Sequence, residues 1–103
     1  MSVNKVILIG RLGKDAKHFN KHGVAFSLVT NTYSWDKARG EKIEHTDWHR
    51  VVVNMEEELD YCKGDQVYVE GLMRTRSWGE GAAKKYITEV IAKTHYLIAR
   101  KGE

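Results

Sequence analysis

Three tryptophans stand among polar and basic residues rather than in apolar runs. An indole ring stacks on any base, because every base offers a π-face, and such stacking holds a single strand without selecting a sequence. Lysine and arginine neutralise the phosphates that run alongside the bases. The pattern therefore indicates a surface for single-stranded nucleic acid. Each tryptophan has a basic residue two positions away: Lys37 follows Trp35, Arg50 follows Trp48, and Arg76 precedes Trp78.

Other basic residues near these tryptophans are candidates for contact with the nucleic-acid backbone. Two alternatives stay open. The basic residues in the loops could serve only to keep those loops hydrated, and the indoles, that of Trp48 above all, could pack a protein interior. The full set of backbone candidates is Lys37, Arg39, Arg50, Arg74, Arg76, Lys84 and Lys85.

Residues with catalytic or metal-binding potential do not form a site. His45 and His49 share a face of an expected strand, but this spacing separates them by roughly 13 Å. Cys62 falls on the apolar face of a short expected helix, where a thiol is usually buried and inert. Gly79-Glu80-Gly81 precedes a strand and lacks the Lys-Ser/Thr element of a phosphate-binding loop. We therefore expect no catalytic residue, no metal and no cofactor.

Length, charge and cysteine content narrow the class of protein. The chain has 103 residues, a net charge of +3 and one cysteine, which suits a single domain without an internal disulfide or a cysteine-based zinc site. Basic residues prevail in 1–50 and 67–103, on either side of an acidic stretch at 51–66, and a basic surface favours a polyanionic partner. No apolar run approaches the roughly 20 residues of a membrane span. We expect a cytoplasmic protein without a membrane partner.

Alternation of apolar and polar residues predicts an almost entirely β-stranded protein. One segment, Met55–Cys62, has apolar residues at helical spacing between an N-cap at Asn54 and a stop at Gly64, which predicts a helix of about two turns. A helix between the third and fourth of five strands is the pattern of the OB-fold, a Greek-key barrel. We expect one domain over residues 1–98 and a frayed end at 99–103. The expected strands are Val3–Leu12, Val24–Tyr33, Thr46–Val53, Gln66–Arg76 and Tyr86–Ile98.

The sequence resembles the bacterial single-stranded DNA-binding protein family over about residues 3–92. The resemblance implies sequence-tolerant binding and protection of single-stranded DNA in replication, recombination and repair by a homotetramer of OB-folds. It also implies that Trp35, Trp48 and Trp78 stack on bases. The segments that carry it are Val3–Asp15, Thr46–Val52 with Trp48-His49-Arg50, Lys63–Gly71 with Arg74–Trp78, and Tyr86–Val90.

Two features depart from the family pattern. Asn54 stands where the family usually has a further stacking phenylalanine, which implies a lower affinity or a smaller site. The sequence ends at Glu103, without the disordered Gly/Gln/Pro-rich tail and acidic tip through which bacterial members recruit other proteins. The resemblance is therefore to a short form, which is either a naturally short phage- or plasmid-type member or one whose tail was removed or is encoded differently. Tail-mediated recruitment of other proteins is not assumed.

Self-association is expected on physical grounds as well. A barrel of about 100 residues buries a limited fraction of its surface, so contacts between subunits add stability. The run Val6–Ile9 is apolar at every position, which is typical of a strand covered on both faces. We expect Val6 and Leu8 at a subunit interface, and the resemblance also places His49 at such a contact. A position of His49 in the barrel interior is the alternative.

Two other functions of the OB-fold stay open. A dimeric primosomal accessory protein has a similar length, but the tryptophans and the Trp48-His49-Arg50 signature favour the DNA-binding interpretation. An RNA-binding chaperone of the cold-shock kind is expected to show aromatic residues in Gly-Phe-Gly-Phe and Phe-Val-His contexts. Neither context occurs in this sequence.

Overall fold

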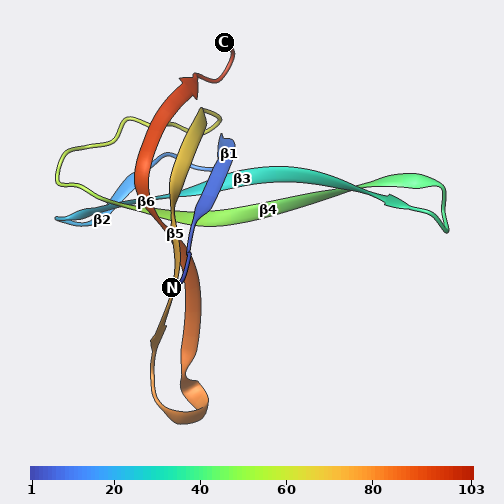
Figure 1. Ribbon diagram of the computed structural model, residues 1–103. Coiled ribbons are helices and arrows are strands. Elements are labelled where there is room, and N and C mark those ends of the chain that lie inside the picture. The colour runs from blue at the N-terminus through green and yellow to red at the C-terminus, as the bar shows by residue number, and fades with distance from the viewer.

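The computed structural model, which describes residues 1–103, is a closed five-stranded barrel from which two long hairpins project (Figure 1). One 3₁₀ turn, η1 (Gly81–Ala83), is its only helical element. The predicted all-β OB-fold class is confirmed. The strands are β1 (Val6–Leu12), β2 (Lys17–Asn20), β3 (Gly23–Asp36), β4 (Glu41–Asn54), β5 (Gln66–Trp78) and β6 (Lys85–Ala99).

The barrel closes because β1 pairs with two partners and β4 pairs with β6. Most of β1 runs antiparallel to β5, and its last two residues, Arg11 and Leu12, pair with β3. Between β4 and β6 the pairing is parallel and short: Val51 lies opposite Val90, and Val52 lies opposite Ile91. The cycle β1-β5-β6-β4-β3-β1 therefore has no open edge within the barrel, and β2 adds a short strand to β3 outside it.

The core is filled by alternate residues of the barrel strands, as the twofold period of a strand requires. Leu28, Val51, Val67 and Val69 are completely buried. Tyr61 reaches the same core from the loop between β4 and β5. Because these residues occupy the inner face of each strand, their neighbours along the chain occupy the outer face. The alternation therefore decides which side chains are available for binding.

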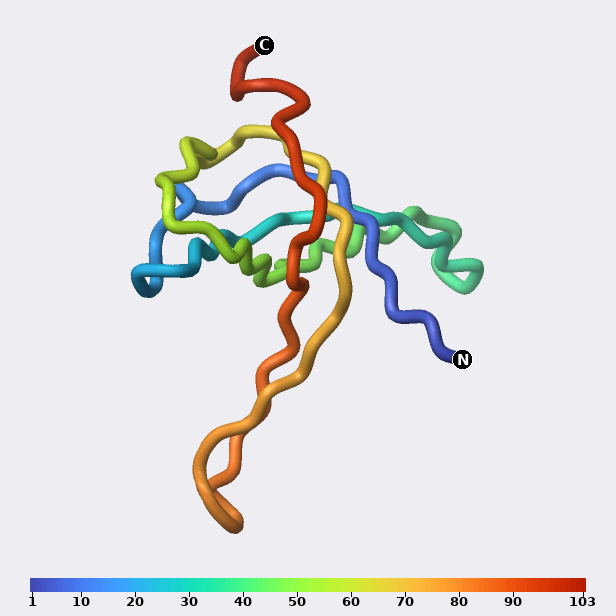
Figure 2. Tube along the Cα trace, turned by 60° about the vertical axis from the view of Figure 1, so that its left-hand side comes forward, coloured from blue at the N-terminus to red at the C-terminus, as the bar shows by residue number.

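The two hairpins extend well beyond the barrel and leave it in different directions (Figures 1 and 2). The β3–β4 pairing continues to Asp36 opposite Glu41, and the β5–β6 pairing continues to Trp78 opposite Lys85. The outer ends of both hairpins, and the whole of β2, lie outside the strands predicted from the sequence. These outer segments are exposed on both faces, so they lack the apolar alternation on which the prediction depended.

The predicted helix over Met55–Cys62 is wrong. Residues 55–65 form a loop between β4 and β5 without helical structure. A helix of about eight residues is marginal by itself because its nucleation is costly. Here the backbone of the segment is used elsewhere: the Ala16 N–H donates to the carbonyl oxygen of Tyr61 at 2.9 Å. Cys62, expected on a buried helix face, is exposed.

The end of the chain is attached to this loop, which differs from the frayed end predicted for residues 99–103. The Arg100 guanidinium donates from Nη1 to Oδ2 of buried Asp65 at 2.7 Å and from Nη2 to Oδ2 of Asp60 at 2.8 Å. Oδ1 of Asp65 accepts the Lys101 N–H at 3.1 Å. These bonds hold the last residues against the barrel.

We predict that Gly71→Ala destabilises the barrel. Gly71 lies at a register shift in β5, and a Cβ atom there would stand 1.9 Å from the carbonyl oxygen of Ile91 on β6. Since backbone rather than a side-chain end must move, we expect a loss of about 1–3 kcal/mol in the free energy of unfolding. Denaturant unfolding measures it, with the exposed Ser77→Ala on the same strand as control. Equal stability of both variants would contradict the close packing at Gly71.

Candidate nucleic-acid interface

Trp35, Trp48 and Arg50 lie on the same outer face of the β3–β4 hairpin. Trp48 is opposite Val29 of β3, and Trp35 follows Val29 by an even number of residues. The side chains of paired residues share a face, and so do residues an even number apart along a strand. Trp35 is 63% exposed and Trp48 is 61% exposed. Neither indole packs the barrel interior, which was the alternative left open by the sequence.

Trp78 lies with two arginines on one face of the β5–β6 hairpin. Arg74, Arg76 and Trp78 alternate along β5, and Arg74 is paired with Glu89 of β6. The Arg76 guanidinium carbon stands 5.7 Å from the centre of the Trp78 ring, within the range of a cation–π contact. Trp78 is 49% exposed. The third indole is therefore also presented to the outside, next to a cation.

Glu89 joins the outer faces of the two hairpins. It is only 5% exposed, and each of its carboxylate oxygens accepts a hydrogen bond from a different hairpin. Arg50 of β4 donates from Nε to Oε2 at 2.6 Å, and Arg76 of β5 donates from Nε to Oε1 at 2.8 Å. Both bonds use Nε alone, so the Nη groups of the two arginines keep donors for another anion. The hairpins thus present one continuous aromatic and basic surface.

The protonation state of Glu89 follows from these contacts. Burial of the carboxylate raises its pKa, but the hydrogen bonds and positive charges of Arg76 and Arg50 outweigh burial and hold the pKa below its ordinary value. Glu89 is therefore ionised at neutral pH. One buried negative charge faces two arginines, which leaves a net positive charge at the junction of the hairpins.

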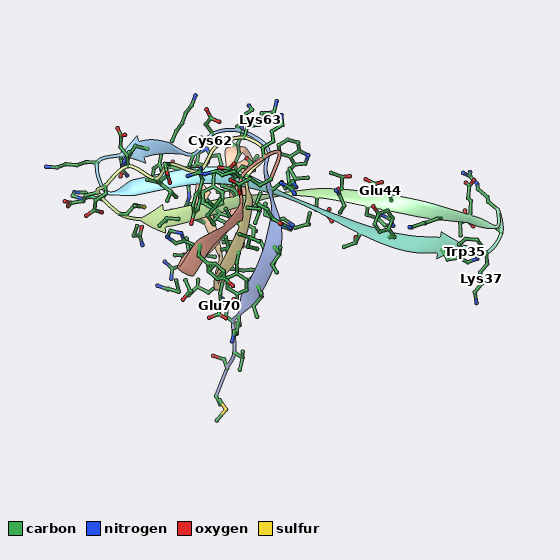
Figure 3. The ribbon with its side chains drawn as sticks, turned by 90° about the horizontal axis from the view of Figure 1, so that it is seen from above. Trp35, Lys37, Glu44, Cys62, Lys63 and Glu70 are labelled. Atoms are coloured by element: carbon green, nitrogen blue, oxygen red, sulfur yellow. The ribbon has the colours of Figure 1, made fainter.

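The remaining basic candidates lie at the two hairpin ends, except Arg74, which is opposite Glu89 in the β5–β6 pairing. Arg39 is paired with Asp36 at 3.7 Å and with Glu41 at 3.6 Å, so part of its charge is already neutralised. Figure 3 shows Trp35 and Lys37 together at the far end of the β3–β4 hairpin. The candidates that form no ion pair are Lys37, Arg74, Lys84 and Lys85.

Several contacts of this surface were not foreseen from the sequence. The Lys42 ammonium stands 4.1 Å from the centre of the Tyr33 ring, beside Trp35. The Trp48 ring covers Gly13, where a Cβ atom would come within 2.1 Å of the indole. Phe19 of β2 is also exposed on this side, near Arg50. Only strand pairing brings these residues together, and no local pattern in the sequence indicates it.

The structure places the residues expected at a subunit interface, Val6, Leu8 and His49, on the inner side of their strands. Val6 and Leu8 of β1 pack against the barrel core, whereas Ile7 and Ile9 point outward and are exposed. His49 is half-buried on the inner side of β4, and its Nε2 forms a 2.8 Å hydrogen bond with the Thr30 hydroxyl. The outward apolar residues of β1 are therefore Ile7 and Ile9.

The chain has no group of three or more His, Cys, Asp or Glu residues arranged to hold a metal ion. Its structure also contains no helix of the length and apolarity that a membrane crossing requires.

A barrel of this topology with an exposed aromatic and basic face is the architecture of the oligonucleotide-binding OB-fold class. A family model described as the single-strand binding protein family matches residues 3–98, and the chain belongs to this family. Proteins of this family bind DNA and are not enzymes.

Solved structures agree with this assignment. A Plasmodium falciparum SSB in complex with ssDNA is 37% identical, with 98% of this chain and 97% of that chain covered and a TM-score of 0.75. A deletion mutant of the single-stranded DNA-binding protein of Thermus aquaticus shares the fold at 24% identity and a TM-score of 0.75, covering 97% of this chain and 52% of the other. A small single-stranded DNA-binding protein of Streptomyces coelicolor shares it at 18% identity and a TM-score of 0.66, covering 95% and 96%.

We predict that Glu89→Gln lowers the melting temperature at neutral pH, because two arginines lose their charged acceptor. The difference from the unsubstituted protein should close as the pH falls. A carboxylate with a depressed folded-state pKa stabilises the fold above its unfolded value, near 4.5, and loses that contribution as the pH falls through the folded-state pKa. Thermal melts of both proteins, from neutral pH to below 4.5, measure the difference in melting temperature. Exposed Glu44→Gln serves as control, and a pH-independent difference would contradict the ion-pair account.

Proposed function

We propose that this chain binds single-stranded DNA without sequence preference and protects it during replication, recombination and repair. The observation that carries the proposal is the single outer surface on which Trp35, Trp48 and Trp78 are all exposed and the arginines of both hairpins meet at Glu89. Bases stack on the indoles, and the phosphates between them approach the free Nη groups of Arg50 and Arg76.

The proposal is supported by a solved relative. The Plasmodium falciparum protein, which is 37% identical over nearly the whole of both chains, has a solved structure in complex with ssDNA. The physics of the surface favours single strands over duplexes, because paired bases cannot offer their faces to an indole. The proposed site of action is the cytoplasm, where exposed single strands arise during DNA metabolism.

We further propose that the partner of the chain, besides DNA, is a second copy of itself, assembled into a homotetramer. The support is a set of exposed apolar residues on the two strands that flank β5: Ile7 and Ile9 of β1, and Tyr96 and Ile98 of β6. Tyr68 of β5 connects the two sides, because it is paired with Ile9 and stacks on Tyr96 with the ring centres 4.8 Å apart. Apolar surface of this kind is stabilised when a second subunit covers it. Several DNA surfaces held in one assembly also make the later contacts intramolecular.

We predict that Trp35→Ala and Trp78→Ala each weaken the binding of oligo-dT by roughly 1–3 kcal/mol, the cost of one lost stack. Tryptophan fluorescence, quenched on addition of oligo-dT, measures the affinity at several salt concentrations. Affinity should fall steeply with salt, because bound phosphates release counterions. Thermal melting should be unchanged, since both indoles are exposed.

Tyr86→Leu serves as the control for these variants, because it removes an exposed ring from the opposite face of the β5–β6 hairpin. Equal binding to duplex DNA, or a titration that does not respond to salt, would contradict the proposed function. If Trp35→Ala lowers the melting temperature and leaves the affinity of the folded protein for oligo-dT unchanged, this indole has a packing role instead.

We predict that sedimentation equilibrium at micromolar concentration gives a mass of four 11.9 kDa chains. Ile7→Lys places a charge among the exposed apolar residues of β1 and β6 and should shift the mass toward smaller species, while Ile43→Lys on the β3–β4 hairpin should not. His49→Lys tests the contact that the family resemblance implies. A mass of one chain for the unsubstituted protein would overturn the assembly, and a mass of two would limit it to a dimer.

A further inference from the structure

A hollow of about 200 Å³ lies beside β2, on the same outer face as Trp48 and Arg50. It is separate from the tryptophans, none of which lines it. β3 contributes its outward residues Ala25 and Ser27, and Ser27 is paired with Arg50 of β4. The hollow therefore continues the surface formed by the two hairpins toward β2.

Phe19 is the aromatic residue at the surface of this hollow. It is 48% exposed, although an unconstrained phenylalanine would be expected to withdraw from water. The end of its ring rests on Gly23, where a Cβ atom would stand 2.3 Å from Cζ. The guanidinium carbon of Arg50 lies 5.7 Å from the ring centre. The ring is thus held in an outward position by a bare backbone on one side and a cation on another.

The charges around Phe19 are favourable for a phosphate. Lys14 and Lys17 line the hollow together with Arg50, and neither lysine forms an ion pair. The only carboxylate in the lining, that of Asp15, accepts the Lys63 N–H through Oδ1 at 2.7 Å, and its single negative charge is outnumbered by the three cations of the lining. An exposed ring beside an excess of positive charge suits one nucleotide of a single strand.

We propose that this hollow is a nucleotide subsite of the single strand, in which a base stacks on Phe19 and the flanking phosphates contact Lys14 and Lys17. The proposal rests on the proposed binding of single-stranded DNA and extends it. The strand that passes Trp48 and Arg50 continues across β3 to β2 instead of leaving the surface at Trp48. Gly23 is a positioning residue, because its missing side chain leaves room for the ring.

The first test measures the affinity of Phe19 variants for oligo-dT of about 15 nucleotides, near the upper end of the site size of one OB-fold. Phe19→Leu keeps apolar bulk over Gly23 but removes the π-face, and affinity should fall by at least about fivefold, the lower bound of one lost stack. Phe19→Tyr keeps the ring and should bind like the unsubstituted protein. Tyr86→Leu, on the opposite face of the β5–β6 hairpin, is the matched control.

A second test addresses the position of the ring. Gly23→Ala pushes the ring end away, since the added Cβ atom would meet the side chain of Phe19, and should weaken binding about as much as Phe19→Leu. In the double variant the two losses should not add, because both act on one stack. Lys17→Gln should lower the slope of log affinity against log salt by about one, as expected for one lost phosphate contact.

The outcomes separate the subsite from the proposed function. Unchanged affinity of Phe19→Leu, or losses that add in the double variant, would overturn the stack on Phe19 while the tryptophan variants still lose binding, and an unchanged salt slope for Lys17→Gln would overturn the phosphate contact. If the unsubstituted protein binds no oligo-dT, the proposed function itself fails. If Phe19→Leu melts at a lower temperature, the salt slope of Lys17→Gln decides, because that variant keeps the ring in place.

Discussion

Two residue pairs of parallel sheet join the long hairpins of this protein, Val51 with Val90 and Val52 with Ile91. Each hairpin is an antiparallel unit with its own register, and β1 links the two on the other side of the barrel by pairing with both β5 and β3. The parallel pairing fixes where one hairpin lies relative to the other. It also places Arg50 and Glu89, which immediately precede the first pair, side by side at the base of both projections. The position of Trp78 relative to Trp35 and Trp48 depends on this junction, because Trp78 lies on the other hairpin.

Burial of a carboxylate is costly unless it is paired and hydrogen-bonded. Glu89 satisfies that requirement with arginines from both hairpins, and the same bonds restrain the arginines in fixed orientations. Each guanidinium donates to Glu89 through Nε, and its Nη groups remain available as donors. Positive charge is therefore preorganised at the junction of the two hairpins, whose outer faces carry Trp48 and Trp78. This arrangement reduces the entropy that the protein would otherwise lose on binding.

The strands with regular apolar alternation, such as the one through Phe26 and Leu28, could be predicted because their pattern reflects burial. The exposure of the tryptophans could be predicted from their polar neighbours. The role of Glu89 could not be predicted from the sequence, because its partner Arg50 is 39 residues away and the contact exists only after the barrel closes. The helix at Met55–Cys62 was predicted from local periodicity, which carries no information about hydrogen bonds to distant strands. In the run Val6–Ile9, where every residue is apolar, the sequence does not indicate which alternate residues face the core.

The central claim is that one single strand follows the outer faces of both hairpins. Photo-cross-linking of iodouracil-substituted oligo-dT, followed by mass spectrometry of the cross-linked peptides, tests it most directly. The account predicts cross-links in the β3–β4 hairpin at Trp35 and Trp48 and in the β5–β6 hairpin at Trp78, all within one complex. Cross-links confined to a single hairpin, or concentrated on the face of Ile7, Ile9 and Tyr96, would contradict it.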